Sequence, residues 1–347
     1  MLFVEIDKTG SATSPLTLGK RVRINGIDYE PRVGDVVAVK AITESVTYGN
    51  LELPSGRLAK INRGDVLLGV LGRRRALKGF VGDVPINLKS GDRLHLLNMG
   101  GVMGECKGHH SSLSDAIELE VIGVACDELG MPMNIADAGL VPSDTLHASA
   151  RIVMIAGSCM NSGKTVAAVE IIRHAANSGL KVAGLKLTGI ACLRDTLNMQ
   201  DHGAFATASF LDCGLPSTVD CENLSSIAKG LFNHLNSFEP DLIVAELGDG
   251  IIGGYGVEAI LRDSEIKKAI SSLVFCASDY VGVTGGIATL RDMGIEIDVV
   301  AGSVTDSQMG EDFVQTQFEV PAGNARRDGL RLFKLVQAGV RAEAALG

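Results

Sequence analysis

The chain has 347 residues, of which 46% are hydrophobic, 21% charged and 4% aromatic. At roughly 100–200 residues a domain, this length predicts two domains, and the apolar content excludes a mainly disordered chain because it can offset the entropy of ordering. A formal net charge of −9 and few aromatic rings disfavour nucleic-acid binding, which uses a basic face and stacking platforms.

The start of the chain and its cysteines bear on where the protein works. Residues 1–7 lack the basic and apolar stretches of a signal peptide, and no segment approaches the ~18 apolar residues of a membrane span. The seven cysteines are scattered, and no two of them form a C-x-x-C pair. This pattern favours reduced thiols over a disulfide framework or a zinc site. We therefore expect a cytoplasmic protein that binds neither membranes nor nucleic acids.

Residues 1–125 are expected to form a β-rich domain. A glycine–aspartate turn leads into an apolar run three times, at residues 33–39, 63–69 and 90–96. Glycine supplies the positive φ of such a turn and aspartate bonds its own backbone, so each turn predicts a following strand. The prolyl turn at residues 54–56 predicts a hairpin. Regular short strands of this kind favour a small barrel or sandwich.

Other stretches of the first half leave two interpretations open. The basic cluster Arg73, Arg74, Arg75 and Lys78 indicates a solvated turn, or else a contact for an anion or a phosphorylated substrate. Residues 98–110 are rich in glycine and hold possible metal ligands at a spacing that matches no zinc pattern. We expect a flexible surface loop there, with a substrate-facing loop at the domain interface as the alternative. Residues 126–150, with two prolines and several small residues, are assigned as a linker.

Residues 151–347 are expected to form an α/β domain. Short apolar runs typical of strands alternate with stretches of helical spacing, the first helix being expected at residues 165–176. The strand-like runs lie at 152–156, 181–187, 242–245, 273–276 and 297–300. This alternation predicts a doubly wound, mostly parallel sheet with helices on both faces and ligands at the carboxyl ends of its strands.

A phosphate-binding loop is predicted where the first of these strands meets its helix. Gly163, Lys164 and Thr165 supply a turn glycine, a lysine for phosphates and a hydroxyl for Mg²⁺, and the helix N-terminus adds partial positive charge. The strict spacing would need a glycine at Ser158, whereas the glycine lies one place earlier, at Gly157. The strand–loop–helix context supports the motif despite this departure. The expected nucleotide-binding residues are Gly157, Ser158, Cys159, Met160, Asn161, Ser162, Gly163, Lys164, Thr165 and Val166.

Two other classes of P-loop protein do not match the sequence. A GTPase would show an Asn/Thr-Lys-x-Asp motif that reads the base, and none is present. The partition ATPases carry a second lysine five positions before the loop lysine, where this chain has Cys159.

The five residues between Gly157 and Gly163 resemble the loop of dethiobiotin synthetase and its relatives, which include the cobyrinic acid a,c-diamide synthases and the molybdopterin-guanine dinucleotide adapter proteins (MobB-like). Three further segments resemble parts of that family. Residues 182–189 resemble its second strand, which ends in a lysine that faces substrate and phosphates. Residues 198–204 resemble its segment with a Mg²⁺-binding aspartate, and residues 243–252 resemble its strand-end segment, whose glutamate also binds Mg²⁺. Segments 280–286 and 300–304 resemble the last sheet segments of the family. The resemblance covers about residues 151–325.

The resemblance implies an ATP- and Mg²⁺-dependent enzyme that phosphorylates a small carboxylate or carbamate before ligating it, and a possible homodimer. Mapped onto this chain, it implies Lys164, Lys186 and Glu246 as catalytic residues, and Thr165, Asp201 and Glu246 as Mg²⁺ ligands. These assignments fit the physical chemistry, because Mg²⁺ prefers oxygen ligands and phosphoryl transfer needs positioning and charge neutralisation.

The chain also departs from that family. Leu187 stands where the family has proline after its lysine, and Asp249 adds a carboxylate in the glycine-rich run after Glu246. The first domain has no counterpart in dethiobiotin synthetase. We therefore expect a different substrate.

Structural roles remain open for several of these residues. Glu246 could cap a helix or pair with a lysine, Lys186 could be a solvated strand end, and Asp201 could be the N-cap of a helix over residues 203–211. Cys159 is interpreted as a loop residue rather than a nucleophile.

The functional alternative is a nucleotide-binding adapter or regulator whose β-rich domain binds a partner. A kinase that releases its phosphorylated product is a third possibility.

Overall fold

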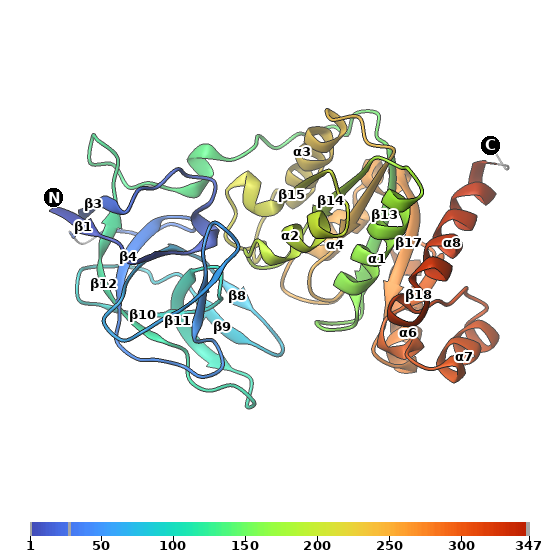
Figure 1. The fold of residues 1–347 in the computed structure, drawn as a ribbon, viewed down its shortest axis with the longest axis horizontal. Coiled ribbons are helices and arrows are strands. Elements are labelled where there is room, and N and C mark those ends of the chain that lie inside the picture. Colours follow the sequence, from blue (N-terminus) through green and yellow to red (C-terminus); the bar gives the residue numbers. More distant parts are fainter. Residues whose placement is uncertain (1, 27–28, 345–347) are drawn as a thin grey trace. The chain divides into compact units, whose positions relative to one another are not determined.

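The computed structural model describes residues 2–26 and 29–344, and the chain divides into two compact units (Figure 1). The first unit comprises Met1–Leu140, Ile190–Arg194 and Phe210–Val219. The second comprises Val141–Gly189, Asp195–Ser209 and Asp220–Gly347. Two short segments beyond residue 151 thus pack with the first unit, whereas the sequence analysis placed them in the second domain. The assignment of these segments to a unit depends on contacts between residues far apart in the chain, which a local sequence pattern does not indicate.

The first unit is built from β-strands, as predicted. Its main sheet has the neighbour order β1-β3-β12-β4-β7-β11-β9-β8, with β10 paired to β11 and β12, and β2 paired to β7. The strands are β1 (Leu2–Glu5), β2 (Lys8–Thr9), β3 (Arg21–Asn25), β4 (Val36–Ala41), β7 (Val66–Leu71), β8 (Arg74–Arg75), β9 (Phe80–Asp83), β10 (Arg93–Leu96), β11 (Val102–His109) and β12 (Glu118–Ala125). A separate hairpin, β5 (Asn50–Glu52) and β6 (Leu58–Lys60), encloses the predicted prolyl turn.

The three glycine–aspartate turns share one geometry. Their glycines have φ values of 90°, 94° and 90°, a region that favours glycine because it has no Cβ. Each aspartate accepts a hydrogen bond on Oδ2 from the backbone N–H three residues earlier, at 2.8 Å for Asp35, 2.6 Å for Asp65 and 3.0 Å for Asp92. Strands β4, β7 and β10 follow directly, so the turn prediction is confirmed.

Two expectations for this unit are corrected. Most of the predicted loop at 98–110 is strand β11, which pairs antiparallel with β9 and β10 and parallel with β7. The basic cluster is not wholly a solvated turn, because Arg74 is only 3% exposed and its guanidinium lies over the rings of Tyr48 and Phe80. Such aromatic faces stabilise a cation that is removed from water. Its neighbour Arg75 pairs with Asp83 at 2.5 Å.

The second unit has a parallel sheet with the strand order β15-β14-β16-β13-β17-β18, which confirms the predicted α/β fold class. Its strands are β13 (Arg151–Gly157), β14 (Val182–Lys186), β15 (Ala206–Ser209), β16 (Leu242–Glu246), β17 (Ile270–Cys276) and β18 (Val299–Ala301). Its helices are α1 (Lys164–Asn177), α2 (Arg194–Asp201), α3 (Leu224–Asn236), α4 (Val257–Arg262), α5 (Ser264–Ala269), α6 (Tyr280–Asp292), α7 (Gln308–Phe318) and α8 (Ala325–Ala344).

Strand β13 lies inside this sheet and is covered on both faces. Successive residues of a strand point to opposite faces, and Ile152 to Gly157 are all buried. Val153 and Ile155 contribute to a core that includes residues of α1 and α8, which pack against each other (Figure 1). The predicted helix over 203–211 does not form, because residues 206–209 pair with β14 as a strand and a 3₁₀ turn, Phe210–Cys213, follows.

No helix among the described residues is long and apolar enough to cross a membrane.

Candidate functional site

The predicted phosphate loop lies between β13 and α1, at the carboxyl end of an interior parallel strand. Gly163 has φ 105° and directly precedes α1, so it adopts a left-handed conformation that most side chains avoid. A Cβ on Gly157 would lie 2.9 Å from the carbonyl oxygen of Cys276 and 2.5 Å from Ser162 Oγ, so a side chain at the displaced glycine of the motif would be crowded. The loop therefore leads directly into the positive end of α1, which favours an anion.

Lys164 is folded over this loop. Its side chain is 6% exposed, and Nζ donates to the carbonyl oxygen of Cys159 at 2.8 Å and to Ser162 Oγ at 3.5 Å. Burial lowers the pKa of Lys164, against the opposing effect of Glu246. A buried cation that has only neutral hydrogen-bond partners gains from an anionic ligand.

The other residues of the loop segment have distinct environments. Asn161 adopts a left-handed backbone conformation (φ 62°), and Ser162 is fully buried. Cys159 carries a free thiol 3.3 Å from Ser278 Oγ, and no histidine is paired with it in the described contacts. The site residues Ser158, Met160 and Val166 are partly exposed.

Glu246 lies at the centre of the site. Thr165 Oγ1 donates to its Oε1 at 3.0 Å, and Lys186 Nζ donates to the same oxygen at 2.7 Å. These three residues come from the start of α1 and the ends of two neighbouring strands, β16 and β14, that run in parallel. The structure thus brings together Thr165, Lys186 and Glu246. Glu246 pairs with a lysine, which is one of the structural roles left open for it, and Lys186 is not a solvated strand end.

Asp195, in the first turn of α2, completes this charged group. Its Oδ2 lies 2.9 Å from Lys186 Nζ, whose side chain is 12% exposed. Burial disfavours the charged ammonium, but Asp195 and Glu246 outweigh burial and raise the pKa of Lys186 above its usual value. Sequence reasoning missed Asp195. Its position at the start of a short helix soon after the Lys186 strand was the available signal.

Mg²⁺ is the metal that the phosphate loop implies, and the donor set here fits it. Glu246 is 1% exposed, and its Oε2 is buried without a hydrogen-bond partner. Such an orphaned carboxylate oxygen, next to the Thr165 hydroxyl, offers the hard oxygen ligands that Mg²⁺ prefers. Among the described residues, no group of three or more His, Cys, Asp or Glu side chains is arranged to hold a metal, at this site or elsewhere.

The structure does not bring the third predicted ligand, Asp201, to this group. Asp201 is exposed at the last position of α2, six residues beyond Asp195, which is about 9 Å along a helix axis. The chain then returns to the end of the sheet where the strands begin, and there Phe205 N donates a hydrogen bond to the carbonyl oxygen of Val182, the first residue of β14. Asp201 does not cap a helix either, since residues 206–209 form β15.

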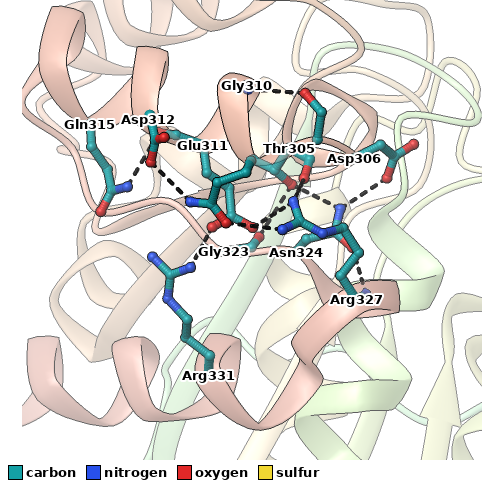
Figure 2. Close-up of polar contacts among 12 residues, drawn as sticks. Thr305, Asp306, Gly310, Glu311, Asp312, Gln315, Gly323, Asn324, Arg327 and Arg331 are labelled. Atoms are coloured by element: carbon teal, nitrogen blue, oxygen red, sulfur yellow. Dashed lines mark hydrogen bonds and ion pairs between the residues drawn. The ribbon is translucent and has the colours of Figure 1, made fainter.

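The segment after β18 supports the phosphate loop from a second side. A Cβ on Gly302 would lie 2.1 Å from the carbonyl oxygen of Ser162, so the two loops pack closely. Figure 2 shows the polar network that holds the following residues. In it, Asn324 Nδ2 donates to Thr305 Oγ1 at 3.1 Å and to Asp306 Oδ1 at 2.9 Å.

No family model and no curated protein matches this chain. Solved structures with distant likeness include chloroplast FtsY from Physcomitrella patens, with 12% identity and a TM-score of 0.39, covering 58% of this chain and 74% of that one. The cell division protein FtsY from Thermotoga maritima has 11% identity and a TM-score of 0.38, covering 60% and 78%. A DUF1611 family protein from Anabaena variabilis has 13% identity and a TM-score of 0.41, covering 57% and 63%.

Likenesses this distant carry no argument about function, and none of them supports the dethiobiotin synthetase family in particular. The resemblance to that family stays a prediction. What the chain's own topology shows is a Gly-Lys-Thr loop between an interior parallel strand and a helix, which is a P-loop NTPase-like fold.

Proposed function

We propose that the second unit binds a nucleoside triphosphate with Mg²⁺ and transfers the terminal phosphoryl group to a small acceptor. The observation that carries this proposal is the convergence of Lys164, Thr165, Lys186 and Glu246 at one edge of a parallel sheet. The loop amides and Lys164 would bind phosphate oxygens, and Lys186 would neutralise charge as it develops on the transferred group. Thr165 and Glu246 would hold Mg²⁺, which neutralises phosphate charge when it is bound.

The finer part of the proposal depends on the resemblance to the dethiobiotin synthetase family at residues 182–189 and 243–252. On that basis the nucleotide is ATP, and the acceptor is a small carboxylate or carbamate whose phosphorylated form is then ligated.

Equilibrium binding of fluorescent ATP and GTP analogues to the full chain, with Mg²⁺, tests the nucleotide site. We expect the wild type to bind and Lys164→Ala to lose binding, because the variant removes the buried ammonium over the loop. Lys181→Ala is a matched control, since Lys181 is an exposed lysine of the same unit that bonds the carbonyl oxygen of Phe238. Equal nucleotide affinity in the wild type and Lys164→Ala would overturn the proposal.

Phosphate release from the Mg²⁺ complex separates the catalytic proposal from the adapter alternative. Small carboxylic acids, amines and bicarbonate are added singly as acceptors. Release that one of them stimulates supports phosphoryl transfer, and a free phosphorylated product identifies a kinase rather than a ligase. Tight nucleotide binding with slow release that no acceptor changes would favour an adapter instead.

A further inference from the structure

Asp249 is a carboxylate beside the phosphate loop that the site described above does not use. It follows β16, three residues after Glu246. Its neighbour Gly250 packs so closely on the phosphate loop that a Cβ there would lie 2.6 Å from the carbonyl oxygen of Ser158. Two residues after Asp249, Ile251 N donates to the carbonyl oxygen of Gly157 at 2.9 Å. The Asp249 loop is thus joined to the phosphate loop.

The same loop also contacts the segment that carries the second lysine. A Cβ on Gly248 would lie 2.2 Å from the carbonyl oxygen of Thr188, two residues beyond Lys186. Asp249 therefore lies in a short loop held between the phosphate loop and the end of β14. This is the side of the sheet where a terminal phosphoryl group, held by Lys164 and Lys186, would meet its acceptor.

The backbone of Asp249 is in an unfavourable conformation. Its φ is 66°, in the left-handed region, where an L-residue with a side chain is disfavoured relative to glycine. The flanking residues Gly248 and Gly250 keep the loop close to its neighbours, so the packing maintains this conformation. Residues held in this way are concentrated at sites where the position of a side chain matters for function.

The Asp249 carboxylate is half-buried and available to a ligand. Among the residues that the structure describes, no side chain forms an ion pair or a hydrogen bond with it, and only the backbone N–H of Gly250 does. Burial raises the pKa of Asp249 above its usual value, against the opposing effect of the Lys164 ammonium. A carboxylate with few partners and a raised pKa is a better proton acceptor than one fixed in an ion pair.

We propose that Asp249 is the general base of the phosphoryl transfer, and that the acceptor therefore carries an O–H or N–H bond. The inference rests on the proposed nucleotide site and phosphoryl transfer. It disagrees with the carboxylate acceptor that the family resemblance implies, and takes a hydroxyl, an amine or water in its place. The acceptor atom forms a bond to the terminal phosphorus as the bond from that phosphorus to the β-phosphate oxygen breaks. The acceptor's proton passes to an Asp249 oxygen, and the nucleoside diphosphate leaves with the bonding electron pair. An ionised carboxylate has no proton to give and would be repelled by Asp249.

Water is the acceptor for the test, since it needs no identified substrate. Phosphate release from the Mg²⁺ complexes of ATP and GTP is measured for the full-length wild type and for Asp249→Asn, with nucleotide affinity measured in parallel. We expect kcat to fall by about 100-fold or more, the range of general-base catalysis, with unchanged nucleotide affinity. Asp312→Asn, which changes an exposed aspartate of α7, should leave both quantities at the wild-type value.

The pH profile separates a base from a structural role. The wild-type kcat should fall on the acid side as Asp249 is protonated, and Asp249→Asn should lose that limb. Lys164 is the charged group whose field acts on Asp249, and it stays in place in the variant.

Four results would overturn the inference. They are an unchanged kcat in Asp249→Asn, a retained acid limb, a raised Mg²⁺ requirement with an otherwise normal kcat, and a wild type that binds nucleotide but releases no phosphate. None of these removes the proposed nucleotide site, which fails only if the wild type does not bind nucleotide or if Lys164→Ala binds it equally well.

Discussion

Thr165 Oγ1 donates a 3.0 Å hydrogen bond to Glu246 Oε1, and this contact joins the start of α1 to the end of β16 across 81 positions of the chain. The bond orients a hydroxyl and a carboxylate side by side, with the second carboxylate oxygen buried and unpartnered. Each group alone is an ordinary polar side chain. Held together, they present the oxygen donors that a hard divalent cation takes from a protein.

Thr165→Val should therefore weaken the Mg²⁺ dependence of nucleotide binding while the fold stays intact. Loss of one charge-assisted contact of about 1.5 kcal/mol corresponds to about a tenfold change in affinity. The measurement is nucleotide affinity as a function of Mg²⁺ concentration. Thr165→Ser is the matched control, because it retains the hydroxyl. If Thr165→Val responded to Mg²⁺ as the wild type does, Thr165 would not be a metal ligand.

Glu311 should be a stabilising residue of the α7–α8 region (Figure 2). Its side chain is only 3% exposed, and it pairs with Arg327 at 3.4 Å and with Arg331. Both arginines keep more than a third of their side-chain surface exposed, so they can be hydrated when the carboxylate is lost. We expect Glu311→Gln to lower the free energy of unfolding by about 1–3 kcal/mol in urea denaturation. Asp312→Asn, on the same helix, should change it by less than about 0.5 kcal/mol.

Glu52 should control the reactivity of a cysteine far away in sequence. Within the first unit this 1% exposed carboxylate accepts hydrogen bonds from Ser11 Oγ, from Leu193 N at 2.7 Å and from Cys192 Sγ at 3.1 Å. Glu52→Gln removes the charge that all three donors face, so the segment 190–194 should open more often.

The rate at which a thiol reagent labels Cys192, followed by peptide mass spectrometry, measures this opening. We expect Glu52→Gln to raise that rate by about tenfold, the equivalent of about 1.4 kcal/mol of local stability. The exposed Glu44→Gln in the same unit is the control. An unchanged labelling rate would show that Glu52 does not hold the segment.

Asp249 should lower the stability of the folded protein near neutral pH. Its folded-state pKa is raised, so its ionised form opposes folding above that pKa, and this unfavourable contribution disappears as the pH falls below the usual aspartate value. Asp249→Asn should therefore raise Tm near pH 7, and the gain should shrink as the pH falls toward 4. Thermal denaturation at both pH values measures the effect.

Asp249→Gly should also remove the unfavourable left-handed conformation at this position, which should raise the free energy of unfolding by about a further 1 kcal/mol. Glu239→Gly is the matched backbone control, because Glu239 also has a left-handed backbone (φ 54°) but an exposed side chain. A lower Tm in both Asp249 variants would show that Asp249 does not destabilise the folded protein.

The sequence alone predicted those parts of the protein whose determinants lie within a few consecutive residues. Gly157 to Thr165 are contiguous, so the strand, the loop and the helix start could be recognised together, including the displaced glycine. The glycine–aspartate turns were predictable for the same reason, since each aspartate bonds a backbone N–H only three residues away. The change from short alternating runs to strand–helix alternation near residue 151 likewise gave the fold class of each half.

Only the tertiary structure decided which distant side chains meet. The sequence pointed to Asp201 and not to Asp195, but the direction of α2 brings Asp195 to Lys186 and carries Asp201 away. Local patterns also did not indicate that residues 190–194 and 210–219 belong to the first unit, or that Arg74 is buried against the rings of Tyr48 and Phe80. A local pattern records the preferences of a segment, whereas these outcomes depend on which surfaces remain for that segment to cover once the rest of the chain has folded.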